Sequence, residues 1–322
     1  MSALAQEVVA PDLLDVERRS SDLARAAQRL LAAPAEAELM ALRACWRRAA
    51  LSWKRASAFR DGPWWTGEPL LRATYWPARG AAIRELLRAE RKPSETVLAE
   101  LGADVKGLYA LEYVLFDQDG EPAAWQRLSG GSGMRARELV LSYAEDLSAL
   151  AAAARAVLER GAAGAATPLA SSGPERLAKL VALLAANVEN SLVARLQLWL
   201  WLTRLQRVRA VDIEGGPSRS SPALMLALLQ GSQRLYLGAA GGGLADLVDR
   251  AAPAVHARVA SEFEATASAL RTLPAPLETP PAVERARVES ALAAAKSLET
   301  ALKTELPSAL GVTLVFSSID AD

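Results

Sequence analysis

One carboxyl group lies inside an otherwise apolar segment, and it is the residue with the clearest chemical consequence. The segment Lys106–Phe116 reads KGLYALEYVLF and has Glu112 near its centre. On a helix, Tyr109 and Glu112 share one face because they are three positions apart. A buried carboxylate is unfavourable unless a cation or hydrogen-bond donors neutralise it. We therefore expect Glu112 to be buried and partnered, either as half of a recognition pair with Tyr109 or as a purely structural acid.

The histidine and cysteine content argues against a catalytic zinc site. Such a site usually takes three protein ligands from histidine and carboxylate and leaves one position open. This chain has one histidine, His256, far in sequence from Glu112, and one cysteine, Cys45. Tyr109 is a poor zinc ligand because a phenol loses its proton only near about pH 10. We interpret His256 as a solvated helix residue and Cys45 as a core residue.

The end of the chain carries several oxygen ligands. Ser318, Asp320 and Asp322 lie close together there, after the apolar run Val312–Phe316. Carboxylates at this spacing could supply hard oxygen ligands to calcium or ferric iron, or they could form a frayed terminus. The apolar run favours docking of the tail, because five such residues are unfavourable in water. If the chain binds a metal, Glu112 and Asp320 are the expected ligands.

Composition limits the class of protein. Lysine plus arginine and aspartate plus glutamate number 37 each, and 51% of the residues are hydrophobic. A zero charge balance argues against a broad nucleic-acid surface and against a polybasic membrane surface. We find neither a membrane-spanning run of the required ~20 apolar residues nor a signal peptide. The protein is then either cytoplasmic or exported by a signal that this sequence lacks.

The apolar residues recur every three or four positions, which predicts amphipathic helices. Three long stretches lack this pattern: Asp61–Arg79, which is rich in aromatic residues, Asp117–Gly133, and the tail Pro307–Asp322. The small residues of Gly161–Gly173 are typical of a linker. Trp199 and Trp201 are two positions apart on one predicted helix, so they cannot both point into one core. Helices are predicted at 12–32, 35–60, 78–91, 95–116, 134–160, 174–210, 219–238, 244–272 and 281–306.

These positions predict an all-α protein of two helical bundles, with domains at residues 1–162 and 174–322. The length of 322 residues also exceeds what one hydrophobic core usually serves.

Five motifs in order resemble those of the imelysin family. Gly107, Tyr109 and Glu112 occupy the places of the GxHxxE signature, with Tyr109 replacing its histidine. The other four are a tryptophan helix leading to a Gly-Pro pair, the step Trp76-Pro77, a weakened RSGRS segment that keeps Arg219-Ser220, and the ending LGVTLVFSSIDAD. The resemblance covers nearly the whole chain.

The resemblance implies an imelysin-like fold of two four-helix-type bundles, related by an approximate internal twofold axis, with a site between them. It implies an exported, periplasmic or outer-membrane-anchored lipoprotein associated with iron uptake. It also brings Arg219 near Glu112 as its expected partner, and it makes Tyr109, Glu112, Arg219, Ser220, Trp76, Ser318 and Asp320 the expected binding residues.

The function that we expect is therefore non-catalytic binding in the cleft between the bundles. The occupant is a small ligand, a metal ion such as iron, calcium or zinc, or a protein partner of an uptake system, without nucleic acid. Membrane contact is expected only through a lipid anchor. Two alternatives stay open: a metal-dependent peptidase of the imelysin type, and an interaction module that has lost the ligand site.

Overall fold

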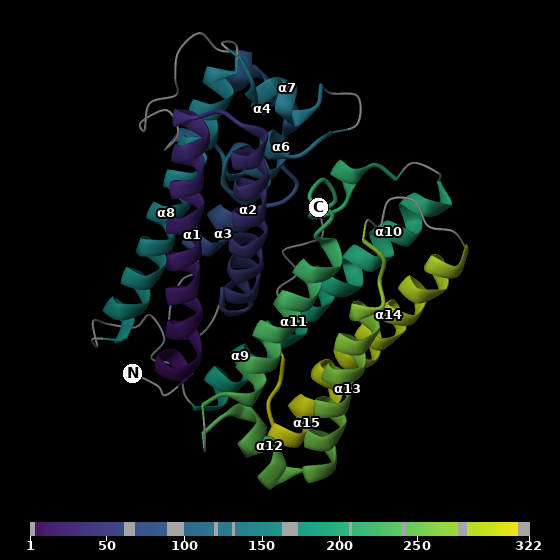
Figure 1. Cartoon of the computed structure of the whole chain (residues 1–322). Coiled ribbons are helices and arrows are strands. Elements are labelled where there is room, and N and C mark those ends of the chain that lie inside the picture. Colours follow the sequence, from purple (N-terminus) through teal and green to yellow (C-terminus); the bar gives the residue numbers. More distant parts are fainter. Residues whose placement is uncertain are drawn as a thin grey trace.

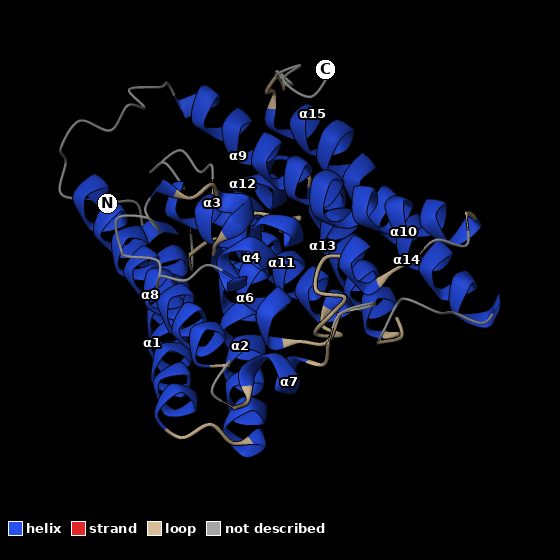
Figure 2. Ribbon diagram, turned by 90° about the horizontal axis from the view of Figure 1, so that it is seen from above, coloured by secondary structure: helices blue, strands red, loops and turns tan. Residues whose placement is uncertain are grey.

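The structure is a computed structural model. It describes residues 4–60, 68–88, 100–118, 122–130, 133–162, 173–205, 208–239, 242–275 and 282–314. Every regular element within these ranges is a helix, as Figure 2 shows. The prediction of an all-α protein is therefore confirmed.

The first half of the chain forms one group of helices. The two long helices α1 (Ala10–Ala32) and α2 (Glu36–Ala56) pack with the longer α8 (Met134–Ala162). Short helices lie against them: α3 (Glu68–Thr74), α4 (Gly80–Arg88), α6 (Gly107–Leu115) and α7 (Ala124–Leu128). A π-helical turn, Ala5–Val9, precedes α1, and the 3-10 turns Ser57–Phe59 and Ala103–Val105 follow α2 and precede α6.

The second half forms a group beside the first (Figures 1 and 2). It comprises α9 (Gly173–Val188), α10 (Ala194–Arg204), α11 (Ser221–Leu237), α12 (Leu244–Ala251), α13 (Pro253–Arg271), α14 (Ala282–Thr300) and α15 (Leu306–Leu310). The π-helical turns Glu189–Val193 and Ala301–Glu305 join α9 to α10 and α14 to α15. A 3-10 turn, Ala210–Asp212, precedes α11.

The observed helices differ from the predicted ones in several places. The helix expected at 244–272 is broken at Ala252, because Pro253 has no backbone N–H and so begins a new helix. The segment expected to be helical from 95 is extended at Lys106, so the signature helix starts only at Gly107. Short helices α3 and α7 lie within stretches expected to be non-helical. The proposed linker falls largely outside the described residues.

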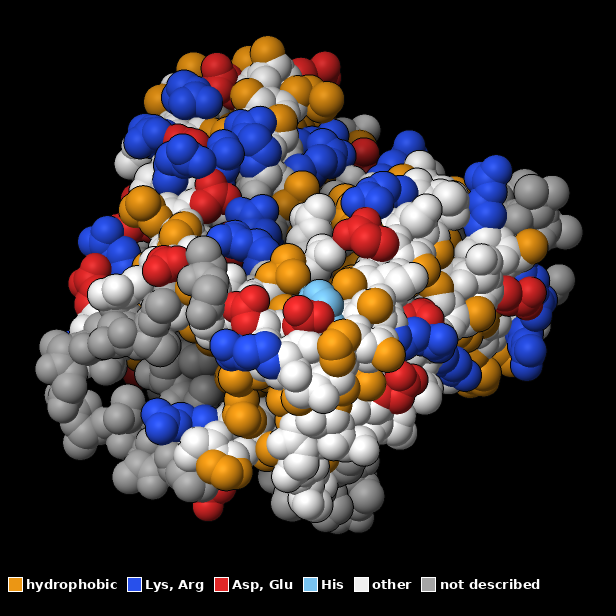
Figure 3. Space-filling view, turned by 90° about the horizontal axis from the view of Figure 1, so that it is seen from below, with side chains coloured by type: hydrophobic (Ala, Val, Ile, Leu, Met, Phe, Trp, Pro, Cys, Tyr) orange, Lys and Arg blue, Asp and Glu red, His pale blue; other side chains and the backbone are white. Residues whose placement is uncertain are grey.

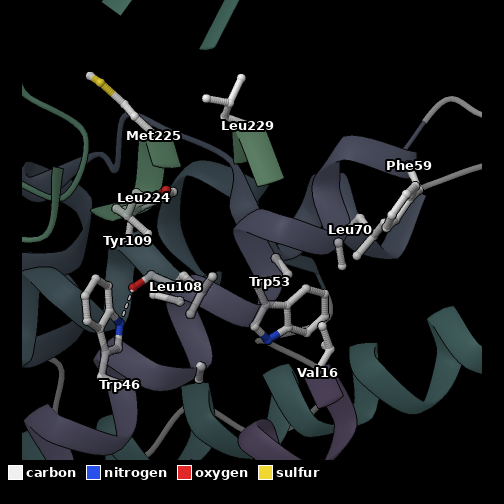
Figure 4. Close-up of a cluster of buried hydrophobic side chains, with 14 of the residues drawn as sticks. Val16, Trp46, Trp53, Phe59, Leu70, Leu108, Tyr109, Leu224, Met225 and Leu229 are labelled. Carbon is white, nitrogen blue, oxygen red and sulfur yellow. Dashed lines mark hydrogen bonds between the residues drawn. The ribbon is translucent and has the colours of Figure 1, made fainter. Parts of the chain in front are cut away.

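One apolar cluster extends through both groups. On α1, the fully buried Leu13, Val16, Leu23, Ala27 and Leu30 recur at helical spacing, which fixes the face of α1 that packs inward. Figure 4 shows that this cluster joins side chains from distant segments. Cys45 is buried within it, as predicted.

The two groups meet where α2 packs against α11. Gly231 of α11 lies so close to α2 that an added Cβ would be 2.2 Å from the carbonyl oxygen of Arg55. A glycine is therefore needed for this approach. Beside it, Asp12 of α1 accepts hydrogen bonds from Arg55 of α2 and Arg234 of α11. The buried Asn187 of α9 also donates to the Ala58 carbonyl across the junction, at 2.9 Å.

Within the described residues, the continuous helix Gly173–Arg204 is long and apolar enough to cross a membrane, judged by length and composition. The prediction that no segment reaches this length and apolarity is therefore wrong. In the structure this helix packs against α11 and α14 as part of the second group. Trp199 is buried on it and Trp201 is 57% exposed, which confirms that they face different surroundings.

The surface carries charges of both signs. Figure 3 shows basic, acidic and hydrophobic side chains interspersed over the face seen from below. Many of these charges pair locally within one helix turn, as Arg285 pairs with Glu289. Such pairs contribute little to stability.

Candidate functional site

Helix α6 is held in place along its whole length. All nine of its residues are buried. Gly107 begins it with φ +81°, and an added Cβ would lie 2.8 Å from the Ala73 carbonyl oxygen, so only glycine fits this start. Trp46 Nε1 donates to the Leu108 carbonyl at 2.9 Å (Figure 4), and Arg127 donates to the Phe116 carbonyl at 2.9 Å. These bonds fix the positions of Tyr109 and Glu112.

A turn from the second group covers this helix. It follows Ala210–Asp212 and reverses direction at Gly215, with φ +72°. Arg219 is also in the left-handed region, with φ +58°, which is uncommon for a residue with a side chain. The turn places the backbone N–H of Ser218 toward Glu112 and the side chain of Glu214 toward Tyr109. We call residues 213–220 the covering turn.

Glu112 is buried and partnered from the second group, as predicted. The Ser218 N–H donates to Glu112 Oε1 at 3.1 Å, and Glu112 is 3% exposed. Burial raises the pKa of Glu112 to about 8, although the Ser218 hydroxyl and N–H and the charge of Arg47 act in the opposite direction. Glu112 is therefore mostly protonated at neutral pH.

Glu214 is the ionised carboxylate of the site. Lys54 Nζ lies 2.6 Å from Glu214 Oε1, Arg195 Nε lies 3.4 Å from Oε2, and the Tyr109 hydroxyl donates to Oε1. Burial alone would raise the pKa of Glu214, but the charges of Lys54 and Arg195 outweigh it and hold the pKa below its usual value. Two cations and a phenol from both groups thus surround this one carboxylate.

Tyr109 serves as a hydrogen-bond donor. Burial, followed by the negative charge of Glu214, raises its pKa well above the usual value for tyrosine. The phenol therefore keeps its proton at physiological pH. A protonated phenol is not a metal ligand, so Tyr109 is unsuited to replace the histidine of the signature in binding zinc.

Two hollows adjoin this polar cluster. The smaller one, about 30 Å³, is lined by Trp76, Ala78, Tyr109, Glu112, Tyr113, Gln118, Val211, Ile213 and Pro217. The larger one, about 730 Å³, is lined by Trp76, Pro77, Leu198, Trp201, Leu202, Leu205, Val208, Arg209, Val211 and Asp212. We call them the small cavity and the apolar cleft. Trp76 and Val211 line both, so the two hollows share a wall at the junction of the two groups.

Trp76 is held between these hollows by a cation. The guanidinium carbon of Arg195 lies 4.2 Å from the centre of the Trp76 ring, within cation–π distance. The same guanidinium forms an ion pair with Glu214. The indole that borders both hollows is thus linked through Arg195 to the buried carboxylate.

A catalytic metal does not fit the described residues. No group of three or more histidine, cysteine, aspartate or glutamate side chains within the described ranges could hold a metal ion. At the signature, the ammonium group of Lys54 already neutralises Glu214, and Tyr109 keeps its proton. His256 lies on α13 and bonds through Nδ1 with the hydroxyl of the buried Tyr236, at 3.0 Å. The described donor set is therefore unlike that of a zinc peptidase.

The predicted site residues are only partly brought together. Tyr109, Glu112 and Trp76 line the small cavity. Arg219 was expected to pair with Glu112, and this is wrong: its side chain is exposed, and the Ser218 N–H bonds to Glu112 instead. Ser220 is buried and bonds weakly to the Ser218 carbonyl, at 3.4 Å. Its side chain does not cap α11.

Two further expectations have different outcomes. Ser318 and Asp320 lie outside the described residues, so their roles remain predictions. His256 is not simply solvated as expected, because it is half-buried against the ring of Tyr236.

Sequence reasoning missed Lys54, Arg195, Glu214 and Gln118. One signal was present for α2: Arg47 and Lys54 are seven residues apart and therefore lie on one face with the buried Ala50. A cation on a face that is otherwise apolar calls for a buried partner. No comparable pattern identifies Glu214, which lies in a turn.

Comparisons with known proteins agree with this architecture. The family model described as Imelysin matches residues 10–305. A search of curated protein sequences found no match. Among solved structures, the chain is similar to one from Parabacteroides distasonis ATCC 8503, provisionally named an iron-regulated protein A precursor, with a TM-score of 0.76 and 13% identity over 96% of this chain and 93% of that chain.

The chain is also similar to an imelysin-like protein from Psychrobacter arcticum 273-4, with a TM-score of 0.67 and 20% identity over 97% of this chain and 95% of that chain. Identities at this level establish a shared fold. The family model covers most of the sequence. This chain therefore belongs to the imelysin family and has an imelysin-like fold.

Proposed function

We propose that this protein is an exported, non-catalytic binding protein associated with iron uptake, and that its ligand occupies the cleft between the two helical groups. The observation that carries the proposal is the pair of hollows at the junction. A polar cavity beside Glu112 adjoins an apolar cleft of about 730 Å³. This volume lies in the range of small-molecule sites, which also combine apolar walls with a few polar groups.

The charge arrangement supports binding rather than catalysis. Glu214 is neutralised by Lys54 and Arg195, and Glu112 is mostly protonated at neutral pH. Neither carboxyl group is free to activate a water molecule as a general base. The iron association follows the provisional name of the similar Parabacteroides structure and the family resemblance.

Complementation of a deletion strain tests this proposal. The strain is grown with an iron chelator, and its growth and iron content are measured with wild-type protein, Trp201→Arg and Leu237→Arg. Trp201 lines the apolar cleft and is 57% exposed, whereas Leu237 is 48% exposed on α11 and lines neither hollow. We expect the wild type and Leu237→Arg to restore growth and Trp201→Arg to fail.

Three results would contradict the proposal, each in a different way. A deletion strain with normal growth and iron content would remove the iron association. Restoration by Trp201→Arg would favour an interaction module that does not use the cleft. Casein hydrolysis by the purified protein, abolished by a chelator and restored by zinc, would favour the peptidase. Fractionation of the cells tests export, which predicts the protein in the periplasm or at the outer membrane.

A further inference from the structure

We propose that the occupant of the junction is an uncharged small molecule with a flat apolar body and one hydroxyl group. The hydroxyl lies in the small cavity against Gln118 and Glu112, and the body lies in the apolar cleft against Trp76 and Trp201. This inference rests on the proposed binding function and specifies the chemical class of its ligand.

Gln118 is the reason that the ligand needs a hydrogen-bond donor. Its Nε2 points toward the carbonyl oxygens of Phe116, at 3.2 Å, and Tyr113, at 3.4 Å, which sets the orientation of the amide. Oε1 consequently faces the other way, and this buried oxygen has no hydrogen-bond partner among the described residues. Gln118 is 5% exposed and lines the small cavity. An unpaired buried acceptor costs about 1–3 kcal/mol, so a donor in the cavity is favoured.

The size and charge of the cavity restrict the polar group. A volume of about 30 Å³ admits a hydroxyl group or one water molecule but not a ring. Lys54, Arg195 and Arg47 surround the two carboxyl groups, and this positive charge disfavours a cationic head group. A carboxylate head group has no proton to donate to Gln118 Oε1. A hydroxyl both donates to Gln118 and accepts from the protonated Glu112.

The apolar cleft restricts the remainder of the ligand. Its two charged lining residues, Arg209 and Asp212, pair with each other at 2.7 Å and leave no net charge. Its apolar lining includes the exposed side chains of Trp201 and Leu205, at 57% and 45%. Indole rings pack well against flat apolar molecules. The shared wall at Trp76 brings such a body next to the small cavity.

Two matched probes test this inference by isothermal titration calorimetry at pH 6.5. 2-Naphthol carries the hydroxyl, and 2-methylnaphthalene replaces it with a methyl group of similar size. We expect one-to-one binding of 2-naphthol, about tenfold tighter than that of 2-methylnaphthalene, which is the difference made by one buried hydrogen bond. Equal affinities, or no binding of either probe, would overturn the inference and indicate a water molecule in the small cavity.

Substitutions in the two hollows test where the hydroxyl group and the apolar body of the ligand bind. Gln118→Met keeps the volume and should make the affinities of the two probes nearly equal. Trp201→Ala should weaken both probes by roughly tenfold and leave their ratio unchanged, because it removes contact with the shared ring system. Leu237→Ala is the control and should change neither affinity. Unchanged binding in Trp201→Ala would place the probes outside the apolar cleft and contradict the proposal.

A pH series on the wild type keeps the test informative if Gln118→Met does not fold. Glu112 can donate to the hydroxyl only while it is protonated; the groups that face it are Tyr109, Glu214, Ser218 and Arg47. Between pH 6.5 and 8.5 the affinity for 2-naphthol should fall severalfold, while that for 2-methylnaphthalene stays constant. A constant ratio would contradict the role of Glu112. The complementation experiment is independent of these probes, so the two proposals can fail separately.

Discussion

Glu112 and Glu214 contribute two buried carboxyl groups to one site and have opposite protonation states at neutral pH. Glu112 lies on α6 among apolar residues with backbone and hydroxyl donors, whereas Glu214 lies on the covering turn between Lys54 and Arg195. The negative charge of Glu214 also raises the pKa of Glu112, in addition to the effect of burial. At neutral pH, Glu112 therefore carries a proton and Glu214 carries a negative charge.

The first prediction concerns stability against pH. The folded-state pKa of Glu112 is about 8, against an ordinary value of 4.5. The folded protein therefore binds more protons than the unfolded chain between these values, and stability falls as pH rises through this window. The loss from this group over the window is on the order of 5 kcal/mol. Urea unfolding of wild type and Glu112→Gln from pH 4.5 to 8.5 measures this loss of stability, because the glutamine side chain does not titrate.

The difference in unfolding free energy between these two proteins isolates Glu112 from other titrating groups, since the remaining residues are common to both. A difference that stays constant over the whole range would show that folding does not raise the pKa of Glu112. The pH dependence of stability that Glu214 contributes has the opposite sign. Because its pKa is lowered in the folded protein, it contributes stability that is lost only as the pH falls below the unfolded pKa.

The second prediction concerns the pair between Lys54 and Glu214. Lys54→Met leaves a carboxylate at a 5% exposed position with Arg195 as its remaining cation. We expect a loss of about 3–5 kcal/mol in unfolding free energy at pH 7. The double variant Lys54→Met/Glu214→Gln should recover much of this loss, since it removes both charges together. Urea unfolding of the four proteins forms a double-mutant cycle, and simple additivity would contradict the pairing.

The third prediction concerns the approach of α11 to α2. Gly231→Ala places a methyl group against the Arg55 carbonyl oxygen, which belongs to backbone and cannot rotate away. Alanine favours a helix by roughly 1 kcal/mol over glycine, but the clash should exceed this gain and cost about 2–3 kcal/mol overall. Gly242→Ala, in a turn, is the control for an added methyl group without a clash, because nothing lies within 4 Å of its added Cβ. Thermal unfolding of both variants checks the order of stability, and equal melting temperatures would refute the close contact.

The fourth prediction concerns the ion cluster around Asp12. This carboxylate is 2% exposed and bonds Arg55 at 2.9 Å and also Arg234, which joins α1, α2 and α11. Because both arginines are partly exposed to solvent, we expect Asp12→Ala to cost about 2–3 kcal/mol rather than the full value of a buried pair. Asp22→Ala removes an exposed pair with Arg25 and should cost under about 0.5 kcal/mol. Similar losses of unfolding free energy in the two variants would show that Asp12 does not stabilise the junction between the two groups.

Helical periodicity predicted the long elements of the fold well. Helices α1, α2, α8 and α11 begin and end within a few residues of the expected positions, because each has a continuous apolar face. The short helices α3 and α7 were missed, because five to seven residues are too few to show a period. The approximate twofold relation and the domain limits at 162 and 174 remain predictions.

The candidate site was only partly predictable. The burial of Glu112 followed from its apolar neighbours, whereas its partner did not. The family resemblance pointed to Arg219, but the left-handed turn there leaves that side chain exposed and directs the Ser218 N–H to the carboxyl group. A backbone donor has no sequence signature. Lys54 and Glu214 are 160 positions apart, and only tertiary packing brings them together.

The apolar cluster that passes from one helical group into the other limits how the chain can be divided. A fragment ending near residue 162 would leave the α2 face that now packs against α11 in water, and it would leave Lys54 without the carboxylate of the covering turn. We therefore expect that neither half folds stably without the other. We expect the whole chain to unfold in one cooperative transition. Chimaeras that join one half of this chain to the other half of a homologous protein should be insoluble.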